Sequence, residues 1–168
     1  MKIGRITVSD RAAAGVYQDR SGPEIERSLR GLFGADAQFV SAIIPDEADM
    51  ISTKLREFAD REQCELIVTT GGTGIGPRDV TPEATQTVLD KECPGFGEIL
   101  RAQAFAQVRT AILSRATAGV RGRSLIVNLP GKPSAVAECL AALAEAIREG
   151  VAHLRGEDPH SARPSKAI

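Results

Sequence analysis

The sequence contains no tryptophan, a single tyrosine and only two histidines among its 168 residues. So few aromatic side chains provide little material for a platform on which nucleic-acid bases could stack. Both histidines, His153 and His160, lie near the carboxyl end, beyond most of the regular hydrophobic pattern. We therefore expect no histidine chemistry, and a metal site would use carboxylate and phosphate oxygens, which suit magnesium rather than zinc or copper.

The sequence also has no large excess of either charge, because it contains 21 Lys and Arg residues and 22 Asp and Glu residues. The basic residues are scattered, which excludes nucleic acid as an expected partner. The three cysteines, Cys64, Cys93 and Cys139, form no C-x-x-C pair, so neither a disulfide framework nor a zinc site is indicated. A reducing cytoplasm fits this usage, and no apolar run approaches the roughly 20 residues of a membrane span.

The most informative stretch that is present is a glycine-rich loop at residues 69–83, which follows a branched apolar run. Its glycines permit positive φ and close backbone approach, so successive N–H groups can converge on an anion. The loop lacks the Gly-Lys-Ser/Thr ending of a P-loop and the G-x-G-x-x-G spacing of a dinucleotide fold. A flexible turn is the alternative, but Arg78 and Asp79 supply both signs of charge, as a magnesium-bound polyphosphate requires. We therefore favour a phosphate-binding loop.

Apolar runs alternate with amphipathic stretches along the chain. Strands are expected at 3–8, 39–44, 66–70, 111–116 and 124–129, and helices at 22–32, 48–61, 82–89, 97–105 and 134–154. We expect residues 119–123 to separate the last two strands, and Thr81 to cap a helix with Pro82 in its first position.

This alternation predicts a three-layer α/β/α fold with a mainly parallel central sheet. The length fits one domain, over residues 1–154. Residues 155–168 contain prolines and few apolar side chains, so we expect a mobile carboxyl-terminal tail there.

Aspartates follow three of the predicted strands: Asp10, Asp46 and Asp79. Ligands of parallel α/β folds bind beyond the carboxyl ends of the strands, so we expect the three aspartates at one rim, around magnesium and a polyphosphate. Each aspartate alone has an alternative as a turn former or helix cap, and Asp46, just before a helix, especially so.

Two further polar residues are ambiguous from the sequence. Lys132 either extends its charge toward phosphate or is an exposed loop lysine. Ser114 either contacts a ligand or begins a turn, and its surroundings in the sequence favour the turn.

Seven motifs occur in order: Val8-Ser-Asp-Arg11, Ile44-Pro-Asp-Glu47, Thr70-Gly-Gly-Thr-Gly74, Arg78-Asp-Val-Thr-Pro-Glu83, Pro94-Gly-Phe-Gly97, Ala111-Ile-Leu-Ser-Arg115 and Asn128-Leu-Pro-Gly131. Together, over residues 2–154, they resemble molybdopterin adenylyltransferases of the MoaB/Mog family. The resemblance implies an enzyme of molybdenum cofactor biosynthesis that moves AMP from Mg-ATP to the terminal phosphate of molybdopterin and releases pyrophosphate. It also implies a homotrimer, and a transient contact with the enzyme that inserts molybdate into the product.

The resemblance assigns catalysis to Asp46, Asp79 and Ser114, and we expect Asp46 and Asp79 to hold or orient Mg²⁺. The expected ligand-binding residues are Asp10, Gly71, Gly72, Thr73, Gly74, Gly76, Arg78, Pro130, Gly131 and Lys132. Family members vary between Gly74 and Arg78, so nucleotide affinity can differ without a change of reaction. Two alternatives stay open: a non-catalytic molybdopterin carrier or scaffold of the same fold, against which both aspartates argue, and an ATP-sensing regulator that binds no pterin.

Overall fold

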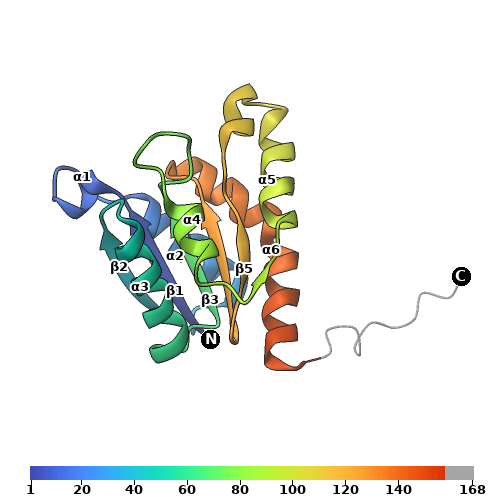
Figure 1. Cartoon of the computed structure of the whole chain (residues 1–168). Coiled ribbons are helices and arrows are strands. Elements are labelled where there is room, and N and C mark those ends of the chain that lie inside the picture. Colours follow the sequence, from blue (N-terminus) through green and yellow to red (C-terminus); the bar gives the residue numbers. More distant parts are fainter. Residues whose placement is uncertain (158–168) are drawn as a thin grey trace, which may run out of the picture.

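Parallel strands form the centre of the molecule. The computed structural model describes residues 1–157 and contains one six-stranded sheet of order β2-β1-β3-β6-β5-β4 (Figure 1). The strands are β1 (Lys2–Val8), β2 (Gln38–Ile44), β3 (Leu66–Thr70), β4 (Lys91–Glu92), β5 (Ala118–Arg121) and β6 (Ser124–Leu129). The first four in spatial order are parallel, whereas β5 and β4 run antiparallel at one edge. The predicted mainly parallel sheet is confirmed.

Helices cover both faces of the sheet, which makes the architecture three-layered. They are α1 (Asp10–Ala13), α2 (Ser21–Phe33), α3 (Ala48–Arg56), α4 (Thr81–Gln86), α5 (Gly95–Phe105) and α6 (Pro133–Arg155), with a π-helical turn η1 (Glu57–Arg61) and a 3-10 turn η2 (Arg109–Leu113). One hydrophobic cluster joins the sheet to α2, α5 and α6, and a second joins its other face to α3 and α4.

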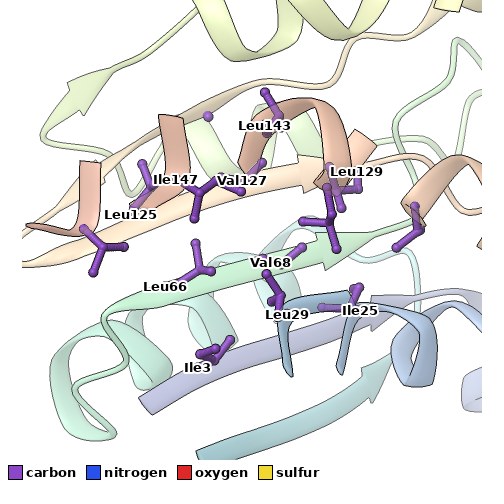
Figure 2. Packing of buried hydrophobic residues seen from close by; sticks show 14 of the residues in the cluster. Ile3, Ile25, Leu29, Leu66, Val68, Leu125, Val127, Leu129, Leu143 and Ile147 are labelled. Atoms are coloured by element: carbon purple, nitrogen blue, oxygen red, sulfur yellow. The ribbon is translucent and has the colours of Figure 1, made fainter. Parts of the chain in front are cut away.

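The larger cluster shows why the amphipathic segments became helices. Ile25 and Leu29, four positions apart on α2, are fully buried, and the apolar stripe of α6 is buried beside them. Figure 2 shows side chains of β3 and β6 with Leu143 and Ile147 of α6 in this cluster. Each such side chain contributes about 1.5–3 kcal/mol when fully buried, so this face anchors the sheet.

The register of the parallel strands places their carboxyl ends at one edge. Val8 lies opposite Ile44, and Thr70 lies between Thr7 and Leu129 in its neighbouring strands. The loops after these four strands therefore emerge side by side, and the loop before α4 rises beyond this edge (Figure 1).

Two expectations about the carboxyl-terminal half are wrong. Residues 111–116 are not a strand: Arg109–Leu113 form the 3-10 turn, and Ile112 and Leu113 are exposed rather than paired in the sheet. The strand lies later, at Ala118–Arg121, so residues 119–121 belong to it and only Gly122 and Arg123 turn the chain. The apolar run at 111–113 matches a short strand in length and composition, which explains the error.

The helix boundaries also differ from expectation in places. The helix predicted over 48–61 is α-helical to Arg56 and then widens into the π-helical turn. α4 begins at Thr81, with Val80 rather than Thr81 at the cap position and Pro82 second, and it ends at Gln86. The elements α1 and β4 were not predicted, because they are too short to show a hydrophobic periodicity in the sequence.

The carboxyl end of the described chain is the end of α6. The helix stops at Arg155, and Gly156 follows in the left-handed conformation that commonly ends helices. The predicted tail begins here, and its residues 158–168 lie outside the described residues. Within residues 1–157, no helix combines the length and the apolar character needed to cross a membrane.

Replacing Leu29 by Ala is expected to lower the free energy of unfolding by about 2–5 kcal/mol, because it leaves a cavity between α2, the sheet and α6. Urea denaturation measures the loss. Val16→Ala is the control, since Val16 is 66% exposed and should change the free energy by less than about 0.5 kcal/mol. Equal effects of the two substitutions would contradict the assignment of this core.

Candidate functional site

Glycine allows two backbones to meet at the end of β3. Gly71 has φ of 100°, and a Cβ there would lie 2.2 Å from the carbonyl oxygen of Val8. Gly72 has φ of 62°, and its Cβ would lie 2.3 Å from Thr81 Oγ1 and 3.0 Å from Asp46 Oδ1. Both positions therefore require glycine, for conformation and for space.

The same loop leaves backbone donors available. Within residues 1–157, the N–H groups of Gly72, Thr73 and Gly74 donate no hydrogen bond to any described residue, whereas the N–H of Gly71 donates to Leu129. Successive N–H groups of this kind form a concave site that suits an anion.

Asp10 and Asp46 hold each other in place. The backbone N–H of Asp10 donates to Asp46 Oδ2 at 2.8 Å, and the backbone N–H of Asp46 donates to Asp10 Oδ1 at 3.0 Å. The ends of β1 and β2 are thus joined through both carboxylates. This arrangement answers the capping alternative, because Glu47 rather than Asp46 precedes α3 and the side chain of Asp46 bonds to Asp10.

Arg78 neutralises the outer part of this acidic group. Its guanidinium donates to both carboxylate oxygens of Asp10, at 3.1 and 2.9 Å, and to Glu47 Oε1 at 2.8 Å. The hydrogen bonds from Arg78 and from the backbone of Asp46 lower the pKa of Asp10. Both carboxylate oxygens of Asp10 thus accept hydrogen bonds, and Asp10 links Arg78 to Asp46.

The pKa of Asp46 is shifted in the opposite direction to that of Asp10. Burial raises the pKa of its carboxyl, and the negative charges of Asp10 and Asp79 add to this rise, against the backbone hydrogen bond from Asp10 and the charge of Arg78. A partly desolvated carboxylate beside two others favours a bound cation. Asp10 and Asp46 are thus in direct contact, and Asp79 is near enough for its charge to act on Asp46.

Asp79 closes the glycine loop. Its Oδ2 accepts a hydrogen bond from the N–H of Gly76 at 2.8 Å, and a Cβ on either Gly74 or Gly76 would lie 2.8 Å from that oxygen. The turn therefore folds tightly around the carboxylate. Oδ1 of Asp79, like Oδ1 of Asp46, accepts no hydrogen bond from the described residues.

Carboxylate oxygens that accept no hydrogen bond are the kind of ligand that magnesium takes. No group of three or more His, Cys, Asp or Glu side chains among residues 1–157 has the arrangement of a metal site. Magnesium is usually held by one or two carboxylates together with substrate phosphates and water, rather than by a cage made only of protein. The donor set of Asp46 and Asp79 agrees with that preference.

The side chain of Arg115 joins the glycine-rich loop to α4. Its Nε donates to the carbonyl oxygen of Gly74 at 2.6 Å and its Nη2 to that of Asp79 at 2.5 Å, while Nη1 pairs with Glu83 in the first turn of α4. The backbone N–H of Arg115 also donates to Thr73, at 2.8 Å.

A second group of predicted residues lines a cavity of about 650 Å³ between α5, η2 and α6. Ser114, Pro130 and Lys132 are among its lining residues. Ser114 accepts a hydrogen bond at Oγ from the N–H of Ala116 at 3.4 Å, and the side chain of Lys132 is exposed and unpaired within residues 1–157. The predicted residues thus divide between an acidic group and this cavity.

The two groups meet at Gly71 and Gly131. A Cβ on Gly131 would lie 3.4 Å from the Cα of Gly71, and Thr70 Oγ1 donates to the carbonyl oxygen of Pro130 at 2.8 Å. No local pattern in the sequence predicts the pairings of Glu47 and Arg115. Both residues lie in the quoted motifs, but their partners are 31 and 32 positions away in the chain.

Buried hydroxyl groups form the layer beneath the loops. Thr69, Thr70, Thr81, Thr85 and Asn128 are fully buried. The side-chain amide of Asn128 donates to the hydroxyls of Thr69 and Thr85, each at 3.0 Å, which ties β6 to β3 and α4. Among the described residues, Thr81 Oγ1 and Asn128 Oδ1 are buried without a hydrogen-bond partner.

Removing the charge of Asp46 is expected to stabilise the ligand-free protein. Because burial raises the pKa of Asp46 in the folded state, stability falls as the pH rises through the interval above the ordinary value of about 3.9. Asp46→Asn keeps an acceptor for the N–H of Asp10 but carries no charge. We expect a higher Tm than wild type near neutral pH, and no difference once the wild-type carboxyl is protonated.

Asp60→Asn is the control for this measurement. The hydrogen bonds and the charge of Arg121 lower the pKa of Asp60 in the folded state, so the ionised carboxylate of Asp60 stabilises the fold. Replacing Asp60 should therefore lower the Tm at neutral pH, the opposite of the effect expected at Asp46. A lower Tm for Asp46→Asn at neutral pH would contradict the electrostatic description of the site.

Comparison with known proteins identifies the family of this chain. A family model described as "Probable molybdopterin binding domain" matches residues 4–149. The chain is 49% identical over 145 residues to a molybdopterin adenylyltransferase of Helicobacter pylori (strain ATCC 700392 / 26695), covering 86% of this chain and 82% of that protein. It is 43% identical over 153 residues to the molybdopterin adenylyltransferase of Escherichia coli K12, covering 91% of this chain and 78% of that protein.

Solved structures lead to the same family. The molybdopterin biosynthesis enzyme MoaB of Thermus thermophilus has a TM-score of 0.84 and 41% identity, over 93% of this chain and 97% of that one. A MogA structure also has a TM-score of 0.84, with 37% identity over 92% and 99% of the two chains. The chain therefore belongs to the molybdopterin-binding domain family of the MoaB and Mog proteins, as its seven ordered motifs predicted.

Proposed function

We propose that the protein is a molybdopterin adenylyltransferase, which transfers AMP from Mg-ATP to the terminal phosphate of molybdopterin. One observation carries the proposal: three successive backbone N–H groups of the glycine-rich loop donate no hydrogen bond to any residue in the described chain. The same loop places Gly72 beside Asp46 and folds around the carboxylate of Asp79. Such a site offers donors to phosphate oxygens and carboxylates to their metal ion. The relatives named molybdopterin adenylyltransferase support the substrate assignment.

In this reaction, a phosphate oxygen of molybdopterin attacks the α-phosphorus of ATP. A new oxygen–phosphorus bond forms, the bond between the α-phosphorus and the bridging oxygen breaks, and pyrophosphate leaves with that oxygen. The products are adenylyl-molybdopterin and pyrophosphate. Transfers of this kind depend mostly on positioning and on stabilising the charge that develops, so they need no histidine.

Mg²⁺, held by Asp46 and Asp79 together with phosphate oxygens, would withdraw negative charge from the polyphosphate. The chain itself supplies the remaining functions. The N–H groups of Gly72, Thr73 and Gly74 bind phosphate, and Asp10, bridged to Arg78, orients Asp46. Ser114 and Lys132, in the wall of the neighbouring cavity, contact the phosphate or the pterin.

The test is a single-turnover assay of the purified protein with molybdopterin, ATP and Mg²⁺, in which adenylylated pterin and pyrophosphate are measured together. Equal amounts of both products are expected. Tight binding of molybdopterin with neither product would indicate a carrier or scaffold. Binding of ATP without molybdopterin would indicate a nucleotide-sensing regulator instead.

Asp79→Asn is expected to lower the rate of AMP transfer about 100-fold or more, because it removes one of the two carboxylates around the polyphosphate. The amide still accepts the hydrogen bond from Gly76, so the fold should persist. Asp60→Asn removes a carboxylate outside the site and serves as the control. Full turnover by Asp79→Asn with an intact fold would exclude a catalytic role for Asp79.

We also propose that the chain forms a homotrimer. Large apolar side chains are exposed on α5, on η2 and on the segment that joins them, among them Phe105, Val108, Ile112 and Leu113. Apolar surface of this kind is typical of contacts between subunits. A cytoplasmic location and a transient contact with the molybdate-insertion enzyme complete the proposal, since the product is the substrate of that enzyme.

Ile112→Asp is expected to shift the protein toward the monomer, because Ile112 is 62% exposed and the substitution places a charge on this apolar surface. Sedimentation equilibrium at several concentrations measures the shift. Met50→Asp is the control, since Met50 is exposed on α3, on the other side of the sheet. A wild-type monomer at all concentrations would overturn the trimer.

A further inference from the structure

The loop that carries Asp79 has few attachments to the rest of the molecule. Within residues 1–157, the hydrogen bonds that tie residues 73–79 to other elements run to Arg115 and, through Arg78, to Asp10 and Glu47. The contacts of Arg78 are made by exposed side chains, which solvent screens. The backbone of the loop itself is therefore held by Arg115.

The guanidinium of Arg115 bridges the two ends of this loop. Nε binds the carbonyl oxygen of Gly74, where the loop begins, and Nη2 binds that of Asp79, where it ends. Hydrogen bonds from a charged donor are roughly twice as strong as neutral ones, and the planar fork fixes the separation of its two acceptors. The backbone of Asp79 is thus fixed relative to the glycines.

The position of Arg115 is unfavourable for α4. The guanidinium lies at the amino-terminal end of that helix, where the macrodipole disfavours a positive charge, and Glu83 in the first turn offsets it. The single N–H of Arg115 Nε and one of the two N–H groups of Nη2 are directed to carbonyl oxygens of the loop. Its contacts serve the shape of the loop.

We propose that Arg115 is a positioning residue for AMP transfer, which sets the backbone of Asp79 against the phosphate-binding glycines by bridging the carbonyl groups of Gly74 and Asp79. This inference rests on the proposed function. It adds a residue that acts through Asp79 rather than through contact with the substrates.

Arg115→Lys tests the proposal, because lysine keeps the charge beside Glu83 but loses the planar fork. We expect kcat about 100-fold lower, the size of effect that a small misplacement of a catalytic group produces. Hydrogen exchange of residues 73–79 should be faster in the ligand-free variant. This second measurement needs no substrate, so it remains informative if the wild-type protein transfers no AMP, which would overturn the proposed function alone.

Two controls match the chemistry of Arg115. Arg121→Lys changes another arginine that binds a carboxylate and a backbone carbonyl, those of Asp60 and Val88. Glu83→Gln removes the ion pair of Arg115 and leaves both carbonyl contacts in place. Both variants should keep kcat within about threefold of wild type, as expected for exposed ion pairs.

A double-mutant cycle separates positioning from general support of the fold. If Arg115 acts through Asp79, then Arg115→Lys should change kcat by no more than about twofold in the Asp79→Asn background. Additive losses, wild-type kcat in Arg115→Lys, or unchanged exchange of residues 73–79 would each overturn the proposal. Arg115→Gln is the second variant, and failure of both variants to fold would assign Arg115 to the fold alone.

Discussion

The constraint on which this site depends is the burial of one carboxylate, that of Asp46, beside other charged groups. Burial raises the pKa of Asp46, and the negative charges of Asp10 and Asp79 add to this rise, so the ionised carboxylate raises the free energy of the folded chain. The protein offsets this cost locally: backbone N–H groups bind one oxygen of each aspartate, and Arg78 binds Asp10. One oxygen of Asp46 and one of Asp79 accept no hydrogen bond from the described residues, and these are the two oxygens that we propose as Mg²⁺ ligands.

The parallel sheet supplies the geometry for this concentration of charge. Four parallel strands end level with one another, so residues more than thirty positions apart become neighbours without long excursions of the chain. This arrangement restricts the residue type at Gly71 and Gly72, because a Cβ there would collide with Val8 or Thr81. Close approach and positive φ coincide at these two residues, and only glycine meets both requirements.

Local patterns in the sequence predict the central strands and the edge of the sheet at which the aspartates lie. Buried branched runs identified the central strands, and the rule that ligands bind at their carboxyl ends placed Asp10, Asp46 and Asp79 together. These patterns could not identify the antiparallel edge of the sheet, because an exposed apolar run at residues 111–113 has the same composition as a short strand. Nor could they pair Arg115 with Gly74, since contacts between distant loops leave no period in the sequence.

The buried layer of threonines and Asn128 beneath the loops has a consequence for the evolution and engineering of this scaffold. A core made of aliphatic side chains can be repacked in many ways, since such side chains interact without direction. The hydroxyl and amide groups at this end of the sheet interact only along fixed directions, and two of their oxygens have no partner in the described chain. Exchanges among apolar side chains of similar volume are therefore tolerated in the aliphatic part of the core, whereas Thr69, Thr85 and Asn128 can each be replaced only by a side chain that keeps these hydrogen bonds.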